Sequence, residues 1–408
     1  MKSPIYTAIV PARLLAALCS VLALCSVSVM AAWADDGTVG PSGKGIVPLQ
    51  NDQVEMVAER VDIYPFHRWA YIEASFTLHN TGPSMKILVG FPEEEYYPEH
   101  PEGRGQRPGT RDFTTEVDGS SLPTTYQPAA PPSEPKRQGP SRTVGWHTFA
   151  LSFGEGQTRE VKHSYFLQPS YSSNGAQIIR YLLQTGATWK GTIGRADIVV
   201  HPSGGYTLDD LTAWRGPGYT TWSDGKTDHV VEDGAIAWHL RDFEPSENDD
   251  VFVYTKQLMC GPFVTDITPG TGETSPGDVI AYDVHEYCQL VPWPAGSSMT
   301  LYGGRDKTRL AETTLSEPTS NVRGEFVLPA DLTPAHGRAV EFWAESEPGG
   351  IRTRSVLVFV RNGPGKLPSG GGPPGALAAV AALAAATTGL GLIGCGVAIR
   401  RQSRKRFG

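Results

Sequence analysis

The sequence predicts a mainly β protein that is exported, with two antiparallel β-sandwich domains in tandem and one C-terminal transmembrane helix. Three observations lead to this prediction. Apolar residues alternate with polar ones, Asp-Gly pairs separate the alternating runs, and a long uncharged segment lies near the C-terminus. Alternation with a period of two is typical of half-buried strands, and Asp-Gly supplies the positive backbone angles of tight hairpins.

Residues 1–34 have the layout of a secretory signal peptide. A basic start precedes an apolar stretch, and an AWA sequence ending at Ala34 offers a small-x-small cleavage site. Cys19 and Cys25 raise the alternative of a lipoprotein anchor, but each follows a leucine where that signal has a small residue. We therefore expect ordinary cleavage near Ala34.

Residues 35–260 are expected to form a β-rich extracellular domain. Its strongest strand signal is WAYIEASFTLHN, and similar alternation occurs in TFALSF and AIAWHL, with VIAYDV following in the next domain. The side chains expected to face the core are Ala70, Ile72, Ala74, Phe76, Leu78, Phe149, Leu151, Phe153, Ile236, Trp238, Leu240, Ile280, Tyr282 and Val284. Hairpin turns are expected at Asp118-Gly119, Asp224-Gly225 and Asp233-Gly234.

Two proline-rich stretches interrupt this domain, at residues 92–108 and 128–140. They lack both helical and strand periodicity, so we expect surface loops. A change of composition near residues 261–277 marks the predicted boundary to an immunoglobulin-like β-sandwich at 261–362. Residues 363–374 then form a Gly/Pro linker.

Cys260 and Cys288 are the two cysteines of the exported part. An oxidising compartment lets such a pair form a disulfide, which we expect here. The alternative is two separate buried thiols.

The uncharged segment at 375–399 is long enough to cross a hydrocarbon core of about 30 Å. A basic tail follows at 400–408, which predicts a cytoplasmic C-terminus and a single-pass protein of the cell membrane. The alternative is cell-wall attachment, because the LPSGG sequence that begins at Leu367 is similar to a sorting signal. Gly370 stands where those signals have threonine, so we expect the membrane anchor to persist.

The segment from Leu182 to Val200 crowds glycines, a lysine and a threonine ahead of an apolar run. A phosphate-binding loop needs strand, glycine-rich loop and helix in that order, with two glycines before the lysine. Here Gly191 follows Lys190. Helical spacing predicts a short helix that Gly186 stops, followed by a strand, and the apolar residues of the helix are Ile178, Ile179, Leu182 and Leu183. We therefore expect a corner, with Trp189 packed inward and Gly191 and Gly194 in a tight turn, and no nucleotide.

The same segment carries a family resemblance. GATWKGTIGRAD, VEMVAERVDIY at Val54–Tyr64 and VGFPE at Val89–Glu93 together resemble a bacterial extracellular domain of unknown function, the DUF4424-like family. The resemblance covers most of residues 35–256 and implies export and a bacterial host. It implies no catalytic residues.

Candidate chemical sites are few, and we expect no catalytic, cofactor-binding or metal-binding residues. His285 begins HEYCQ, which resembles a zinc-protease helix but has Gln289 at the second histidine position and follows a strand pattern. The acidic cluster is Glu244, Glu247, Asp249 and Asp250, which calcium could suit, although a solvated turn is favoured. Another group is Glu93, Glu94, Glu95, Tyr96 and Tyr97, either an exposed binding lip or, more simply, a solvated loop.

The chain has 43 acidic and 35 basic residues, a balance that gives no sign of nucleic-acid binding. We expect a membrane-anchored, noncatalytic surface protein whose partner is an envelope protein or polysaccharide. The alternative is an envelope hydrolase that acts on glycans or peptides through carboxylates that no motif marks.

Overall fold

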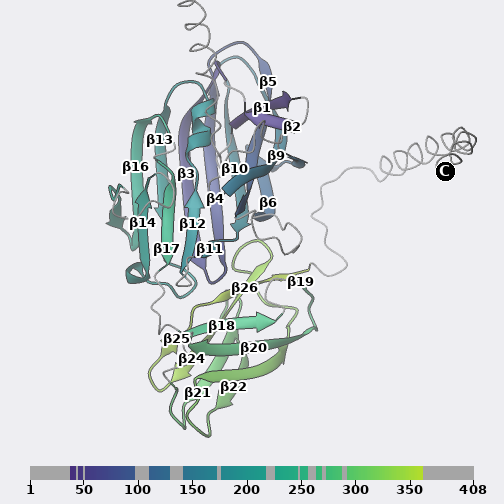
Figure 1. Cartoon of the computed structure of the whole chain (residues 1–408). Coiled ribbons are helices and arrows are strands. Elements are labelled where there is room, and N and C mark those ends of the chain that lie inside the picture. The colour runs from purple at the N-terminus through teal and green to yellow at the C-terminus, as the bar shows by residue number, and fades with distance from the viewer. Residues whose placement is uncertain are drawn as a thin grey trace, which may run out of the picture. The chain divides into compact units, whose positions relative to one another are not determined.

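The computed structural model describes residues 37–42, 45–48, 51–96, 110–128, 141–171, 176–216, 226–246, 249–255, 263–268, 273–286 and 292–361. Over these residues the protein is mainly β, with several sheets and no α-helix (Figure 1). None of the helical segments among them has the length and apolar character of a membrane span. The signal peptide, Cys260, Cys288, the linker, the predicted span and the basic tail lie outside the described residues.

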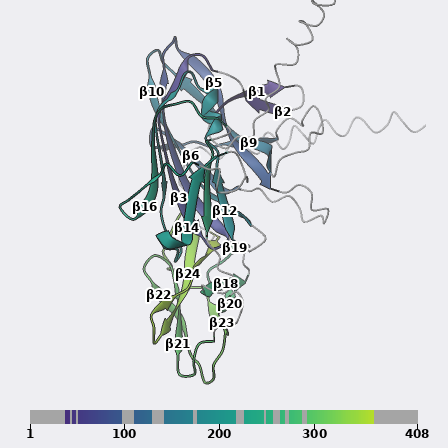
Figure 2. The same ribbon diagram turned by 60° about the vertical axis from the view of Figure 1, so that its left-hand side comes forward.

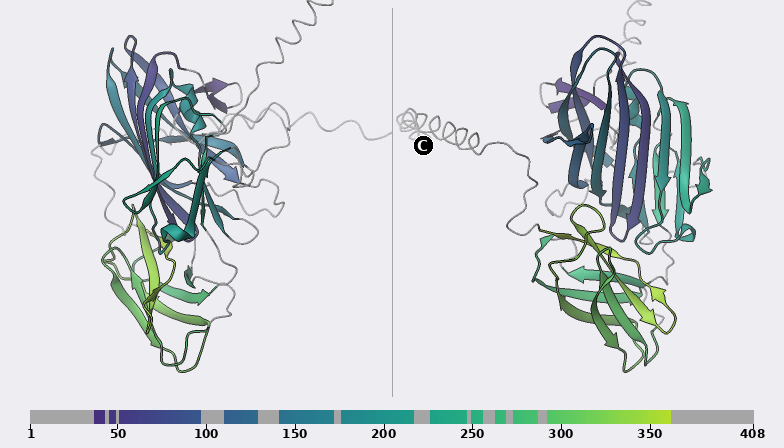
Figure 3. Two further views of the ribbon diagram at one scale, coloured as in Figure 1. Left: turned by 90° about the vertical axis from the view of Figure 1, so that its left-hand side faces the viewer. Right: turned by 180° about the vertical axis from the view of Figure 1, so that it is seen from behind.

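An eight-stranded sheet forms one layer of the N-terminal part and appears as a broad surface in Figure 3. Its strands in spatial order are β15 Val230–Glu232, β16 Ala235–Phe243, β13 Ile193–Val200, β3 Val54–Phe66, β4 Trp69–Asn80, β10 Thr158–Leu167, β6 Thr110–Val117 and β7 Ser120–Ser121. Strands β3 and β13 pair in parallel, so the expectation of purely antiparallel sheets is wrong at this position. The long connection between these two strands gives the chain enough length to return in the same direction.

Two further sheets contribute to the same core. A five-stranded sheet has the order β2 Gly45–Pro48, β1 Gly37–Ser42, β5 Met85–Tyr96, β9 Ser141–Phe153 and β8 Thr125–Pro128. A four-stranded sheet has the order β11 Ser170–Tyr171, β12 Gln177–Tyr181, β17 Val251–Thr255 and β14 Leu211–Arg215. Figure 2 shows β12 and β14 against the layer that contains β3, and side chains of all three sheets share one hydrophobic cluster.

Residues 263–361 form two more sheets around a separate hydrophobic cluster. The three-stranded sheet contains β18 Phe263–Thr268, β20 Val279–Glu286 and β23 Asn321–Val327. The other sheet has the order β19 Glu273–Thr274, β26 Val356–Val360, β24 Ala339–Glu347, β21 Ser298–Gly303 and β22 Thr308–Thr314, and β25 Ile351–Arg352 pairs with β24.

The predicted alternation is confirmed in the four strands that carried it. In β4, Ala70, Ile72, Ala74, Phe76 and Leu78 are all buried. The inward residues of β9 and β20 are buried as well, and so are Ile236 and Trp238 of β16, while Leu240 is partly buried. The hairpins at Asp118-Gly119 and Asp233-Gly234 have positive φ at both residues, as a type I′ turn requires. Asp224-Gly225 lies outside the described residues.

The corner before β13 differs from the prediction. Ile178 and Ile179 belong to strand β12, and the helical turn is a 3-10 helix, η1, at Gln184–Thr188. The apolar pattern at 178–183 fits both periods, and antiparallel pairing with β17 selects the strand. Trp189 is buried and Gly191 has a φ of +70°, as expected of a tight corner.

Gly194 has a different role from the predicted turn, because it lies within β13. A Cβ atom there would be 2.8 Å from the carbonyl oxygen of Val57. Glycine is therefore needed for the close approach of two strands, and not for a positive φ.

The first proline-rich stretch begins later than predicted. Strand β5 continues through Pro92 to Tyr96 and pairs with β9 over its whole length. Glu93 is completely buried, so the predicted solvated loop is wrong at this residue. Residues 97–109 and 129–140 lie outside the described part of the chain.

Candidate functional site

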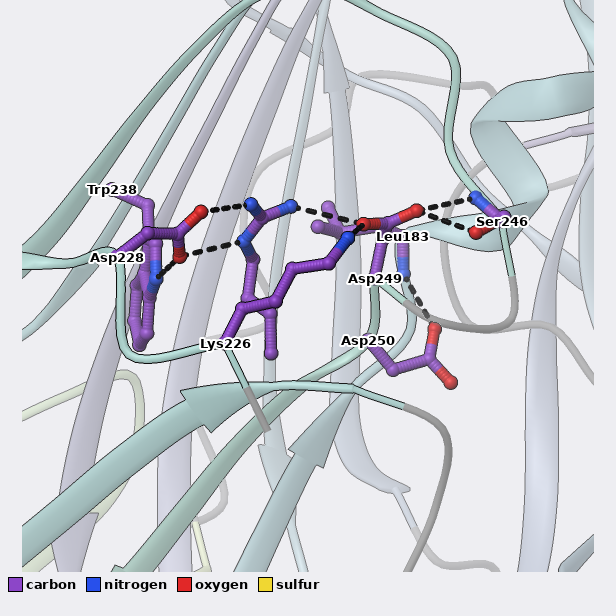
Figure 4. A network of polar contacts seen from close by, with 8 residues as sticks. Leu183, Lys226, Asp228, Trp238, Ser246, Asp249 and Asp250 are labelled. Carbon is purple, nitrogen blue, oxygen red and sulfur yellow. Dashed lines mark hydrogen bonds and ion pairs between the residues drawn. The ribbon is translucent and has the colours of Figure 1, made fainter. Parts of the chain in front are cut away.

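A network of charged side chains lies at the ends of β14 and β17 (Figure 4). Its members are Arg180, Arg215, Lys226, Asp228, Asp249 and Asp250, three cations and three carboxylates. Two of the carboxylates come from the acidic cluster noted in the sequence. Arg215, Asp249 and Asp250 are almost fully buried, which makes this network a candidate site.

Arg215 is central because of its position in β14. Leu211 and Ala213 point into the hydrophobic cluster, and residues two apart on a strand share a face, so Arg215 also points inward. Its side chain is only 6% exposed. A guanidinium in that position is stable only when anions meet its donors.

Two carboxylates meet those donors. Arg215 donates from Nη1 to Asp249 Oδ1 at 3.1 Å, and from Nε to Asp228 Oδ1 at 3.3 Å. Its Nη2 forms a further ion pair with Asp228. Burial raises the pKa of Asp228, but the hydrogen bonds from Arg215 outweigh it, and the net pKa is lowered.

Asp249 is held from both sides. Lys226 Nζ lies 2.9 Å from its Oδ1, and Ser246 donates to its Oδ2 from the backbone N and from Oγ, at 3.1 and 2.6 Å. Burial acts to raise the pKa of Asp249, and the bonds from Lys226 and Ser246 reverse the direction. The carboxylate therefore stays ionised and ties the segment before β17 to Arg215.

Asp250 faces a different set of donors. Arg180 Nη2 lies 2.7 Å from its Oδ2, and the backbone N of Leu183 donates to Oδ1 at 3.3 Å. Burial is the dominant effect and raises the pKa of Asp250 to about 6 despite the nearby Arg180. Asp249 thus pairs with Arg215 and Lys226, while Asp250 pairs with Arg180, and the predicted solvated turn is wrong for both carboxylates.

The network also connects two sheets. Trp238 of β16 donates from Nε1 to Asp228 Oδ1 at 3.0 Å, while Arg215 belongs to β14. Lys226 and Asp228 form the accessible end, with side chains 53% and 46% exposed. The arrangement can hold strand ends in place and present a balanced pair of charges to solvent.

No group of three or more histidine, cysteine or acidic side chains in the described ranges is placed to hold a metal ion. Glu244 is exposed, and Glu247 lies outside these ranges. His285 belongs to strand β20, as expected from its alternation, while Cys288 and Gln289 are not described.

The sequence analysis missed Arg180, Arg215, Lys226 and Asp228. Arg215 carried a usable signal, since a charged residue continues the inward face of an apolar strand. The partners themselves had no signal, because Arg180 and Asp250 are 70 residues apart in the sequence.

No protein-family model and no curated protein matches the chain. A solved structure of a candidate nutrient binding protein from Legionella pneumophila is similar at 19% identity with a TM-score of 0.40, over 54% of this chain and 72% of that one. An M1 zinc metallopeptidase from Deinococcus radiodurans is similar at 10% identity with a TM-score of 0.26, over 61% of this chain. The chain spans 51% of that metallopeptidase, about half of its length.

The protein is β-rich with several sheets, it resembles these structures only distantly, and the similarities identify no family. The resemblance to the DUF4424-like domain therefore stays a prediction.

Proposed function

We propose that the protein is a noncatalytic, membrane-anchored protein of the bacterial cell surface that presents its β-rich part to an envelope or extracellular partner. The finer architecture belongs to this proposal: two β-sandwich domains in tandem, at 35–260 and 261–362, on one C-terminal transmembrane helix. The signal peptide, the uncharged segment at 375–399 and the basic tail support this placement.

The observation that carries the noncatalytic part is the mutual pairing in the Arg215 network. Arg215 and Asp249 are almost fully buried, and both use their donor and acceptor atoms on each other and on neighbouring side chains. A catalytic carboxylate must reach a substrate proton or a reacting atom. Asp249 and Asp250 instead hold the ends of strands, which suits a scaffold that displays a surface.

The test uses the full-length protein with a tag after Gly408, expressed in a bacterial host. We expect detergent to extract the intact tagged protein from the membrane, and immobilised protein to retain one component of the envelope. Removal of residues 375–408 is the matched control and should release the protein from the membrane. Tagless protein bound covalently to peptidoglycan would contradict the membrane anchor.

Incubation of the same preparation with peptidoglycan, polysaccharide and peptide substrates separates binding from catalysis. We expect these substrates to stay intact. Steady release of soluble fragments, lost after denaturation, would overturn the noncatalytic proposal in favour of an envelope hydrolase.

A further inference from the structure

The N-terminal part and residues 263–361 form an interface, and the described residues up to Arg361 belong to one compact unit. Backbone hydrogen bonds cross this interface: His67 N donates to Ser355 O at 3.0 Å, and Ser355 N donates to Gly204 O at 2.9 Å. His67 lies in the turn between β3 and β4, whereas Ser355 directly precedes β26. Two loops of the N-terminal part are therefore tied to the start of β26.

A separate apolar cluster spans the interface. It contains four aromatic residues of the N-terminal part and three apolar residues of 263–361, which are Phe66, Trp69, Tyr71, Phe166, Ala339, Leu357 and Phe359. All of them are buried. Trp69 and Phe166 each meet the Phe359 ring edge-on, with centroids 5.2 and 4.9 Å apart. This cluster holds the two parts together, because separation would return its apolar surface to water.

An ion pair also crosses the interface. Arg338 donates to both carboxylate oxygens of Asp112, from Nε at 2.7 Å and from Nη2 at 2.6 Å. Asp112 lies in β6 and has a φ of +53°, which non-glycine residues seldom adopt. The register of β6 against β10 shifts beside it, between Ser164 and Phe166. An irregularity of this kind re-aims a side chain, and the Asp112 carboxylate reaches the other part of the chain.

His336 is an ionisable group among the aromatic rings of this interface. It belongs to residues 263–361, and its ring stacks on Tyr71 with centroids 4.0 Å apart and an interplanar angle of 23°. Tyr64 and Phe66 lie beside it, with centroid distances of 5.2 and 5.7 Å. These three rings belong to β3 and β4. The imidazole is therefore packed against the N-terminal part.

The groups that face His336 favour its neutral form. Tyr64 and Tyr71 are its titratable neighbours on β3 and β4, and burial raises the pKa of both phenols, so both are neutral near pH 7. Glu73 is the charged group next to them, and it accepts a hydrogen bond from the Tyr71 hydroxyl at 3.0 Å. Burial lowers the pKa of His336 to about 4, and the positive charge of Arg305 acts in the same direction.

We propose that this interface is sensitive to acid, so that protonation of His336 releases residues 263–361 from the N-terminal part. Protonation places a positive charge among aromatic rings and near Arg305, and separation of the two parts returns that charge to water. The orientation of the N-terminal part relative to residues 263–361 would then change in acidic surroundings. The inference goes beyond the proposed function and depends on neither the membrane anchor nor the envelope partner.

The sign of the pH effect follows from the lowered pKa of His336. Contact between the two parts favours the neutral imidazole, so this stabilisation is fully present above about pH 6.5 and is lost as the pH falls toward about 4. At about pH 4.5, pKa values of 6.5 in the open state and about 4 in the closed state weaken the interface by about 80-fold.

The test measures hydrogen exchange of the full-length protein in detergent by mass spectrometry, at about pH 7 and about pH 4.5, with rates corrected for the intrinsic effect of pH. We expect backbone amides in peptides that contain His67 and Ser355 to lose protection in acid by up to about 80-fold. Strand β21 is the internal reference, because its Leu301 lies in the core of residues 263–361 and should stay protected.

Two variants remove the titrating group. His336→Phe keeps an aromatic ring against Tyr71 and cannot be protonated, so the acid response of the interface should largely disappear. His336→Gln is neutral and smaller, and it should have the same effect if the phenylalanine disturbs the packing. His79→Gln is the matched control and should keep the full response, because His79 bonds to Thr158 at 2.9 Å within the N-terminal part.

Unchanged protection of the interface in acid would overturn the proposal, and so would the same acid response in the His336 variants and in His79→Gln. Equal loss of protection at the interface and in β21 would also contradict it. That result would describe unfolding of residues 263–361 and not their release.

Discussion

The Arg215 network and the pair formed by Glu93 and His147 both contain buried carboxylates, but different partners offset the cost of burial in each. Around Arg215, the charges of Asp249 and Asp228 face permanent cations, and their hydrogen-bonding atoms are used within the protein. Glu93 of β5 is fully buried and instead accepts hydrogen bonds from the backbone N and the hydroxyl of Thr110, and its Oε2 lies 2.9 Å from Nε2 of His147 on β9.

This difference predicts which contacts cost most to break. Two permanent opposite charges in a buried pair depend on each other, because removal of either leaves a buried ion without a partner. The charge of Glu93 depends instead on the two donors of Thr110 and on one imidazole. The partner of a buried carboxylate therefore matters as much as its burial.

The largest expected effect is the loss of stability caused by Arg215→Ala in the Arg215 network. Asp249 would remain buried with fewer donors, so the free energy of unfolding should fall by about 3–5 kcal/mol. Urea denaturation followed by circular dichroism measures this change. Arg60→Ala is the control: its pair with Asp62 is at 2.7 Å but its side chain is 53% exposed, so a loss below about 1 kcal/mol is expected. Equal losses would remove the distinction between buried and exposed pairs.

The pH dependence of stability tests whether Arg180 keeps the Asp250 carboxylate ionised in the folded protein. Its pKa is raised from 3.8 to about 6 in the folded protein, so the folded state binds the proton more tightly. Its stabilising contribution is therefore present below about pH 4 and is lost as the pH rises through about 6, by about 3 kcal/mol in total. Asp250→Asn should flatten the dependence of unfolding free energy on pH in this window. An unchanged profile would show that Arg180 holds the carboxylate ionised throughout.

Glu93→Gln tests whether the buried Glu93 carboxylate stabilises the fold, because glutamine has nearly the same shape. The amide keeps one acceptor for Thr110 but directs NH₂ donors where Glu93 accepted bonds, and a loss of about 1–3 kcal/mol in unfolding free energy follows. Glu55→Gln is the matched control, because Glu55 pairs with Lys190 at 3.0 Å and is 39% exposed. The idea of a structural carboxylate at Glu93 fails if thermal denaturation gives the two variants the same stability.

The smallest effect concerns His239, which uses both ring nitrogens. Nδ1 lies 2.7 Å from Asp197 and Nε2 lies 2.8 Å from Glu232, and the hydrogen bond to Asp197 is the main reason that the pKa of His239 is raised. This stabilisation is fully present below about pH 6.5 and is lost as the pH rises through the raised value. NMR titration of the imidazole should give a higher pKa for His239 in the unmodified protein than in the Asp197→Asn variant. Identical titrations would contradict the geometry.

Predictions from the sequence succeeded where a single strand decides the outcome. The inward faces of β4 and β9 followed from alternation, and the hairpin at Asp118-Gly119 followed from residues that tolerate positive φ. The prediction failed at Ile178, where a short apolar run fits a helix and a strand equally well until β17 pairs with it. It failed also at Glu93, because a run of glutamates predicts solvent exposure.

Local sequence patterns were enough to predict a mainly β chain, because alternation and turn residues act over a few neighbours. It also supplied the export and membrane predictions, which depend on local composition. The folded arrangement of the strands is needed to bring Asp249 to Arg215, Asp250 to Arg180, and Glu93 to His147. These contacts join strands that are distant in the chain, and a carboxylate has the same local pattern whether its partner is water or a buried cation.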